Sequence, residues 1–497
     1  MNSATALAEI LEILDLQNEW LAVDASGKSF ALQNREIEVT CERGKIILGY
    51  LDEKGFQLWR VAGYKIEQDV LILDVTRSFG REKTVIKFVP RISAHELSAA
   101  VELARLERAN EIARLIVAEN PPSKLIRVAL NKENGRSAEI IFESANKAQT
   151  AVLADISDSL TPENLLTTAI LWAVKLGGRK KNPIATVWIP AEKKLYKKLR
   201  KLHALLKSGW QSKIIIKEIS REASEPQTVR LIEKRILTMA DLRREKPLAF
   251  SLPETVETSR TATEIIKLSP DKIDVVFSRH GETVRFCGLP LARIRRIGDA
   301  EKCWFGIERD KKILNEQTRE EFFDLLENLE NYRRADSPNK RHELYRLAPE
   351  AWLEAVLRRN INLLDKNLVL SPIHHQFRAD GDKIDLLALR KDGRLIVIEI
   401  KTSPDREMVY QAADYWRKIE LQRLCGNLQK AKIFGDLEIA DKPALVFLVA
   451  PTLSFHYHFD FFANTVAPEI EIYRFNLNEN WRENLKVMKV EEIPKKF

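Results

Sequence analysis

Residues 384–403 read IDLLALRKDGRLIVIEIKTS, and this stretch decides the fold of the C-terminal part of the chain. Two apolar runs rich in Leu, Ile and Val flank the turn-forming residues 391–393, a pattern that predicts a β-hairpin. Three charged side chains, Asp385, Glu399 and Lys401, stand within or beside these runs. Because an unpaired charge is costly to bury, charges in apolar strands indicate a functional site.

The length of the turn decides on which face of the hairpin each charge lies. Glu399 and Lys401 are two residues apart on one strand, so they lie on the same face. A two-residue turn would place Asp385 on the opposite face. A three-residue loop, 391–393, with Gly393 in the left-handed conformation places Asp385 opposite Glu399. We predict the three-residue loop because only this loop gathers the three charges.

Asp385 and Glu399 predict a metal site. Two neighbouring carboxylates repel each other unless a cation lies between them, and hard oxygen ligands without sulfur favour Mg²⁺ or Mn²⁺. Lys401 beside them would hold or help deprotonate a metal-bound water. Such a set suits hydrolysis of a phosphodiester, because metal ions activate the nucleophile and neutralise the developing charge.

These residues resemble the PD-(D/E)xK nuclease superfamily, in its RecB-like and Cas4-like branch. The resemblance rests on Asp385 followed by Glu399-Ile400-Lys401 on the next strand. Gln411 and Tyr415 then lie four residues apart, on one face of the following helix, like the Gln-x-x-x-Tyr motif of that branch. The chain departs from the family at Ile384, which stands where a proline is usual.

The resemblance covers roughly residues 340 to 480 and implies a restriction-endonuclease-like core of helix, three strands, helix and strand. The first core helix would begin at Pro349, because proline suits the first turn of a helix. The last strand would be 444–450. The implied reaction is Mg²⁺-dependent cleavage of nucleic acid, with DNA favoured.

The family pattern also implies roles for individual residues. Asp385 and Glu399 would bind the metal together with the Ile400 carbonyl, and Lys401 would orient the attacking water. Three further side chains complete the implied site: Glu354, Gln411 and Tyr415. The first would support the metal or an outer-shell water, and the other two would position the substrate strand.

Residues 93–220 repeat the same order of elements, with a helix, three strands, a helix and a strand. Aligning Asp155 with the predicted ligand Glu399 places Ser157 at the lysine position, and Glu139 would match the upstream aspartate. Two interpretations stay open. The segment is either a degenerate nuclease-like domain that has lost its lysine, or another kind of α/β domain.

We predict a multi-domain α/β chain, because 497 residues exceed a single compact core. The expected parts are a small N-terminal β-rich domain (1–92), the α/β domain (93–220), a linker (221–263), a β-rich and helical connector domain (264–340) and the nuclease-like domain (341–497).

Composition bounds the setting and the partners. The net charge of +8 permits a polyanionic partner, and the lysines and arginines of 193–201 form the densest basic run together with those of 179–181. The alternative for this run is a solvated lysine face. The four cysteines are scattered, no apolar run approaches about 18 residues, and no signal peptide is expected, which favours the cytoplasm over a membrane. Cutting both strands with one site per chain would favour a homodimer.

Two competing interpretations remain. In the first, the chain is a catalytically silent nucleic-acid-binding or assembly protein, in which the three charges form a structural ion network. In the second, residues 279–283, Arg-His-Gly-Glu-Thr, resemble the histidine phosphatase signature. Their flanks alternate like a β-hairpin rather than the strand and loop of that family, so we predict a hairpin without phosphatase chemistry.

Overall fold

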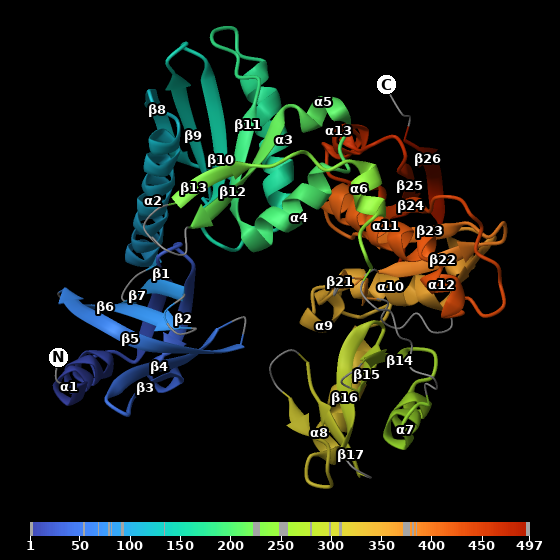
Figure 1. Cartoon of the computed structure of the whole chain (residues 1–497). Coiled ribbons are helices and arrows are strands. Elements are labelled where there is room, and N and C mark those ends of the chain that lie inside the picture. Colours follow the sequence, from blue (N-terminus) through green and yellow to red (C-terminus); the bar gives the residue numbers. More distant parts are fainter. Residues whose placement is uncertain are drawn as a thin grey trace. The chain divides into compact units, whose positions relative to one another are not determined.

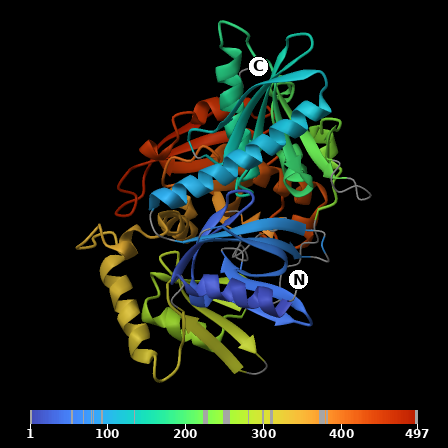
Figure 2. The ribbon, with the colours of Figure 1, turned by 90° about the vertical axis from the view of Figure 1, so that its left-hand side faces the viewer.

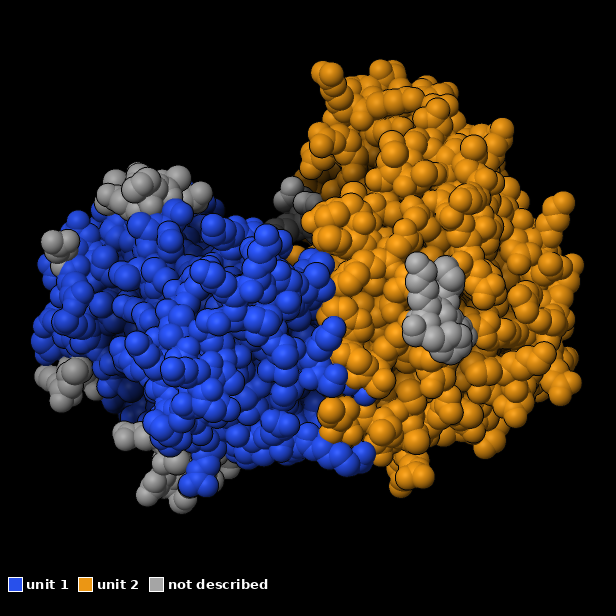
Figure 3. Space-filling view, turned by 90° about the horizontal axis from the view of Figure 1, so that it is seen from above, with its two compact units in different colours: residues 1–200, 211–235 blue, residues 201–210, 236–497 orange. Residues whose placement is uncertain are grey.

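The computed structural model is a mixed α/β chain with several sheets (Figure 1). It describes residues 3–52, 55–67, 69–77, 80, 82–90, 94–133, 135–221, 229–247, 257–278, 281–297, 300–307, 311–370, 378–379, 382–383 and 385–493. The chain divides into two compact units, which Figure 3 colours separately: residues 1–200 with 211–235, and residues 201–210 with 236–497. Within the described ranges, no helix is both long enough and apolar enough to cross a membrane.

The first unit begins with one helix on a sheet of seven antiparallel strands, in the order β2-β1-β7-β6-β5-β4-β3. The elements are α1 (Ser3–Asp15), β1 (Glu19–Asp24), β2 (Ser29–Gln33), β3 (Ile37–Glu42), β4 (Lys45–Asp52), β5 (Gly55–Glu67), β6 (Val70–Arg77) and β7 (Glu82–Pro90). Ala6, Ile10 and Leu14 recur every four residues and are buried against this sheet. Within the described residues, the segment expected to be β-rich thus holds one α-helix and seven strands.

A second sheet of the first unit has six strands in the order β13-β12-β11-β10-β9-β8. The elements along this stretch of the chain are α2 (Ala94–Glu119), β8 (Ser123–Leu130), β9 (Ser137–Ser144), β10 (Gln149–Asp155), α3 (Pro162–Gly177), β11 (Val187–Glu192), α4 (Lys193–His203), α5 (Ser208–Gln211), β12 (Ile214–Arg221) and β13 (Val229–Glu233). Residues 201–210 of this stretch, the end of α4 and most of α5, belong to the second unit. The long helix α2, light blue in Figure 2, buries Ile112 and Ile116 against β9 and β10. The Thr161 hydroxyl accepts a hydrogen bond from the Asn164 N–H and caps α3.

The second unit holds an antiparallel five-stranded sheet in sequence order. Its elements are α6 (Met239–Arg243), α7 (Arg260–Leu268), β14 (Ile273–Ser278), β15 (Gly281–Phe286), β16 (Leu289–Ile297), β17 (Ala300–Phe305), β18 (Lys312–Ile313), α8 (Arg319–Tyr332) and α9 (Glu343–Arg346). Phe322, Leu326 and Leu329 of α8 belong to the same core as α7 and this sheet. The apolar stripe of α8 therefore faces the core.

A second sheet of this unit has six strands in the order β19-β22-β23-β24-β25-β26. The elements are α10 (Pro349–Arg359), β19 (Leu368–Leu370), β20 (Arg378–Ala379), β21 (Asp382–Lys383), β22 (Leu386–Arg390), β23 (Leu395–Ile400), α11 (Met408–Leu424), α12 (Asn427–Lys430), β24 (Leu445–Pro451), α13 (Phe459–Thr465), β25 (Glu471–Leu477) and β26 (Val487–Glu492). Leu353 and Leu357 of α10 share a core with Ile396, Ile398 and Ile400. Alternation along β23 therefore puts Glu399 on the other face.

The two six-stranded sheets have the same topology. From β8 to β13, successive pairs are antiparallel, antiparallel, parallel, parallel and antiparallel. From β19 through β22 to β26, the pairs follow the same sequence of directions. In each sheet a helix precedes the first strand and another joins the third strand to the fourth. The repeat of element order read from the sequence is therefore present as a repeat of strand order and direction.

The predicted hairpin register is confirmed. Leu389 pairs with Leu395, and the backbone N–H of Arg390 donates to the carbonyl of Arg394 at 2.8 Å, which leaves a three-residue loop. Gly393 has a φ of +83°, the left-handed conformation that the loop requires.

The interpretation of 221–263 as a linker is wrong. The segment contains β13, which pairs with β12 at the edge of the sheet, and α6, which is capped by Thr238. Strand β13 has only five residues, and as an edge strand it needs an apolar face on one side alone. Its sequence is therefore too short and too polar to be distinguished from a linker. The first residues of α7 lie here as well.

We expect Gly393→Ala to destabilise the second unit more than Gly435→Ala. Both glycines have positive φ, which costs alanine about 1–2 kcal/mol. A Cβ at Gly393 would also lie 2.9 Å from the Glu438 carbonyl oxygen and 3.0 Å from the Ala440 nitrogen, whereas a Cβ at Gly435 meets no atom within 4 Å. Overpacking of this kind adds about 1 kcal/mol or more. Urea unfolding measures both variants, and equal losses would contradict the close contact.

Candidate active site

The three charges predicted to form a site lie together at one end of the hairpin. Asp385 directly precedes β22, and the pairing of Leu386 with Ile398 continues to place Asp385 opposite Glu399. The backbone N–H of Ile400 donates to Asp385 Oδ2 at 2.9 Å. Lys401 Nζ lies 3.0 Å from Glu399 Oε1. The predicted gathering of the three side chains on one face is therefore present.

Glu399 is a buried carboxylate that is only partly satisfied. The residue is 2% exposed, and its Oε2 atom has no hydrogen-bond partner in the part of the chain that the structure describes. Burial raises the pKa of Glu399 well above its ordinary value, and the charge of Asp385 raises the pKa further, while Lys401 opposes this shift. A buried oxygen without a partner costs about 1–3 kcal/mol, so this atom is poised to accept a ligand.

Lys401 is the positive charge of the cluster. Burial lowers its pKa, but the Glu399 carboxylate, followed by Asp405 and Glu350, reverses this effect, so the pKa of Lys401 is raised. Lys401 Nζ lies 3.4 Å from Asp405 Oδ2. Asp405 escaped the sequence interpretation, although its spacing of four residues from Lys401 was visible. Lys401 is therefore a charged hydrogen-bond donor at neutral pH.

Glu354 lies within an arginine network. It is buried on α10 and pairs with Arg358 and with Arg285, whose Nη1 lies 3.4 Å from Glu354 Oε1. Arg358 Nη2 also donates to the Asp385 carbonyl at 3.4 Å. Arg285 comes from β15 and holds Asp274 through two hydrogen bonds of 2.9 and 3.0 Å. The network thus links the five-stranded sheet to the backbone of Asp385.

Gln411 and Tyr415 lie one turn apart on α11, which packs against β23 and β24. Both side chains are half-buried, and Gln411 Oε1 is a buried acceptor with no hydrogen-bond partner among the residues that the structure describes. Between them, Asp414 is held by Arg417 at 2.8 Å and Lys418 at 2.6 Å. Burial alone would raise the pKa of Asp414, but these two cations lower it below its ordinary value.

The donor set near Glu399 fits a hard divalent cation. Two carboxylates, Asp385 and Glu399, adjoin each other, and the buried Glu399 Oε2 lacks a partner. Oxygen donors of this kind suit Mg²⁺ or Mn²⁺. Within the described ranges, no group of three or more His, Cys, Asp and Glu side chains is arranged to hold a metal. The remaining ligands would therefore be backbone carbonyls and water.

In the six-stranded sheet of the first unit, Asp155 occupies the position that corresponds to Glu399, and its carboxylate accepts hydrogen bonds from a neighbouring residue. In the antiparallel pair of β9 and β10, Asp155 lies opposite Ser137 and not opposite Glu139. The proposed match of Glu139 to Asp385 is therefore wrong by two residues, because Glu139 lies opposite Leu153. The Asp155 carboxylate accepts hydrogen bonds from the N–H and hydroxyl of Ser157 at 2.9 and 3.0 Å. Among the described residues, no second carboxylate and no lysine take part in these hydrogen bonds, although burial and, to a smaller extent, the charge of Asp158 raise the pKa of Asp155.

The phosphatase-like segment is a hairpin, as predicted. β14 and β15 pair antiparallel on either side of it, while Arg279 and His280 lie outside the described residues. Glu282 accepts hydrogen bonds from the N–H and hydroxyl of Ser259, at 3.0 and 2.8 Å, and so fixes the start of α7. Glu282 therefore serves to hold a helix end.

Comparison with known proteins adds one distant similarity. No family model and no curated protein matches the chain. A solved structure of EndoMS in its apo form is similar over 40% of this chain and 88% of that chain, with 10% sequence identity and a TM-score of 0.15. A TM-score of this size does not establish a shared fold.

The raised pKa of the buried Glu399 carboxyl group predicts that the stability of the fold depends on pH. Its folded-state pKa is raised, so without divalent cations the folded chain holds a proton that the unfolded chain releases. The free energy of unfolding should therefore fall as pH rises from about 4.5 to the raised pKa, by up to about 1.4 kcal/mol per pH unit. Glu399→Gln should remove this slope in urea unfolding with EDTA present.

The control for this experiment is Glu316→Gln, which changes an exposed glutamate of the same unit. The slopes are compared rather than the absolute stabilities, because Glu399→Gln also removes the ion pair with Lys401. If the free energy of unfolding changed with pH in the same way for wild type and Glu399→Gln, the raised pKa of Glu399 would be contradicted.

Proposed function

We propose that this chain is a metal-dependent nuclease that hydrolyses phosphodiester bonds of nucleic acid, with DNA as the favoured substrate. The observation that carries this proposal is the buried oxygen of Glu399, which has no hydrogen-bond partner among the described residues, beside Asp385 and Lys401 on one face of a hairpin. A structural ion network would satisfy each buried oxygen, since burial without a partner only costs stability.

Topology gives independent support. A helix, three strands, a helix and a strand follow each other from α10 to β24, with β20 and β21 as an additional hairpin. This order matches the core that the resemblance to the PD-(D/E)xK superfamily implies. The motif residues fall at the corresponding places, with Glu399 on the third strand and Gln411 and Tyr415 on the helix that follows it.

In this proposal Asp385, Glu399 and the Ile400 carbonyl would hold Mg²⁺ or Mn²⁺. When bound, the ion would supply Lewis-acid activation of the attacking water and neutralise charge on the phosphate. Lys401 would orient this water as a charged donor, since its raised pKa keeps it protonated. The role of Lys401 is therefore positioning of the nucleophile rather than removal of its proton.

The other predicted residues would act around this centre. Glu354 would position Asp385 through Arg358, which contacts both. The unpartnered Gln411 Oε1 is an acceptor for substrate or water, and Tyr415 lies one turn further along the same helix. The topologically equivalent sheet around Asp155 would be a degenerate copy without activity.

A binding protein that keeps the fold but does not turn over is the second candidate. The ion pairs of Lys401 with Glu399 and Asp405 favour it, because they neutralise part of the cluster without a metal. Metal-dependent cleavage separates the two candidates, since both would hold nucleic acid.

The test is cleavage of circular plasmid and labelled single-stranded DNA by the full chain, with Mg²⁺, Mn²⁺ or EDTA. We expect metal-dependent cutting, which Lys401→Ala reduces by about 100-fold or more, as is typical for loss of a group that positions the nucleophile. Asp155→Asn, at the position equivalent to Glu399, is the matched control and should cut like wild type.

Absence of cutting by wild type that still binds DNA would favour the silent binder. Cutting that survives Lys401→Ala would place the activity elsewhere. Nicking of plasmid against shortening from an end would distinguish endonuclease from exonuclease action.

Metal binding can be measured without activity. Mg²⁺ or Mn²⁺ should raise the unfolding temperature of wild type, since a ligand at 100 times its Kd stabilises by about 2.7 kcal/mol. Glu399→Gln and Asp385→Asn should lose this rise, and Glu316→Gln should keep it. Equal rises in all four proteins would exclude these carboxylates as ligands.

A further inference from the structure

A loop after β24 lies beside the candidate site. β23 and β24 are parallel, so both end at the same edge of the sheet, where Lys401 follows β23 and residues 452–458 follow β24. The Ser454 hydroxyl donates to the Thr402 carbonyl at 3.0 Å, which ties this 452–458 loop to the residue next to Lys401.

The 452–458 loop exposes apolar side chains to an unusual degree. Tyr457 is 83% exposed and Leu453 is 78% exposed, the two highest values among the large hydrophobic side chains that the structure describes. Two such side chains within one short loop, next to a candidate site, indicate a contact surface rather than chance exposure.

The exposed tyrosine belongs to a run of rings. The ring of Tyr457 lies 4.3 Å from that of His456 and 4.1 Å from that of His458. His458 lies 6.1 Å from Phe461, which lies 5.7 Å from Trp210. These five residues form the aromatic run, and all belong to the second unit.

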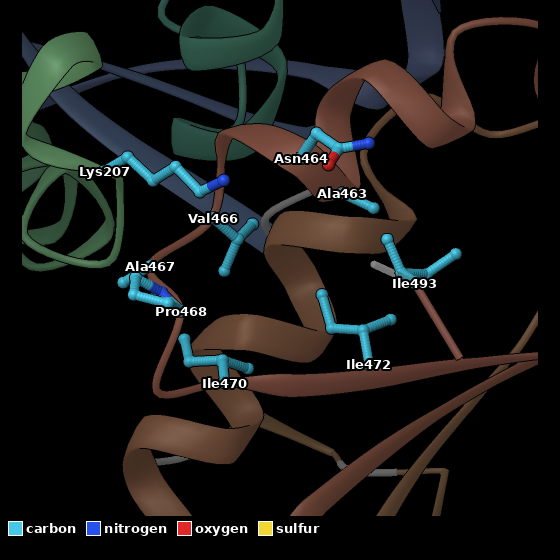
Figure 4. A pocket seen from close by; sticks show the side chains of 9 residues that line it. All are labelled: Lys207, Ala463, Asn464, Val466, Ala467, Pro468, Ile470, Ile472 and Ile493. Atoms are coloured by element: carbon cyan, nitrogen blue, oxygen red, sulfur yellow. The ribbon is translucent and has the colours of Figure 1, made fainter. Parts of the chain in front are cut away.

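The aromatic run rests on fixed neighbours. The Lys207 N–H donates to the Thr465 carbonyl at 2.8 Å, and the Ala467 N–H donates to the Leu205 carbonyl at 2.7 Å, so the chain before Trp210 is joined to α13. Figure 4 shows Lys207 and Val466 at this junction, where a cavity of about 10 Å³ has room for no more than one water.

The inner side of the loop is packed as well. The guanidinium of Arg474 lies 4.2 Å from the ring centre of Phe455 and 5.2 Å from that of Phe459. Both phenylalanines are buried, and they stand directly before and after residues 456–458, which contribute three of the five rings of the aromatic run. Phe455 and Phe459 thus pack inward, while Tyr457 between them is exposed.

We propose that the aromatic run binds unpaired bases of single-stranded nucleic acid beside the active site. This inference rests on the proposed function and names its substrate class. Every base has an apolar face that stacks on aromatic rings, so such a surface suits strands of any sequence. In a duplex these faces are covered by neighbouring bases, so the run favours single strands, flaps or other unpaired segments. The net charge of +8 suits the same polyanion.

The test measures binding of the full chain to fluorescein-labelled oligothymidylate and to a blunt duplex by anisotropy, with EDTA present so that nothing is cut. Tyr457→Ala should weaken binding to the single strand by about 5-fold to 100-fold, the range for loss of one base–aromatic stack, and should leave duplex binding unchanged. Tyr457→Phe should bind like wild type. Phe56→Ala, which removes an aromatic side chain 61% exposed elsewhere, should also bind like wild type.

Unchanged single-strand binding by Tyr457→Ala would overturn the inference, and so would an equal loss for single strand and duplex. Failure of wild type to bind the single strand would overturn it too. Because EDTA removes cleavage from the measurement, the outcome is separate from that of the proposed function. If binding depended on Tyr457 but no metal-dependent cutting were found, the proposed binding surface would stand and the proposed nuclease activity would be rejected.

Discussion

The buried carboxylate of Glu399, held beside Asp385 by the register of one hairpin, is the constraint on which the candidate site depends. A single-residue change in the turn would move Asp385 to the other face and leave Glu399 alone in an apolar sheet. Gly393, in the left-handed conformation, fixes that turn. The close approach of Glu438 and Ala440 to Gly393 leaves no room for a side chain there, so the register is held from both sides.

The two sheets of equal topology show what the carboxylate pair adds. In the first unit, Asp155 accepts hydrogen bonds from its neighbour Ser157, and Ser137 stands opposite it. In the second, Glu399 has an oxygen without a hydrogen-bond partner in the described ranges and faces a second carboxylate. The same strand order thus carries a hydrogen-bonded carboxylate, Asp155, in one sheet and an incompletely hydrogen-bonded carboxylate, Glu399, in the other. The fold alone therefore does not determine chemistry.

The arginine network explains why the five-stranded sheet belongs to the same unit as the candidate site. Arg285 of β15 holds Asp274 on its own sheet and Glu354 on α10, and Glu354 in turn pairs with Arg358. Breaking one member would leave a buried charge without its partner, which costs about 3–5 kcal/mol. The connector domain thus supports the position of Asp385, although it contributes no residue to the carboxylate pair.

The sequence by itself determined the local features of this protein. Alternation and turn residues predicted the hairpin and the common face of Glu399 and Lys401, because these depend on neighbours within about twenty residues. The turn residues left two registers open, and the three-residue loop was predicted because only this loop adds Asp385 to that face. The cap of α3 at Thr161 is local as well, since it joins residues three positions apart. The repeat of element order was also readable, since periodicity reports helices and strands one at a time.

Only the tertiary structure decided which distant residues meet. It set Ser137 rather than Glu139 opposite Asp155, through a register that no short turn signal revealed. The tertiary structure also brings Arg285 into contact with Glu354, 69 residues away, and pairs β13 with β12 at the edge of the six-stranded sheet of the first unit. The 452–458 loop lies beside Thr402 because parallel strands end at one edge, whatever their separation in sequence. Such pairings depend on how whole sheets assemble, and local patterns carry no record of that.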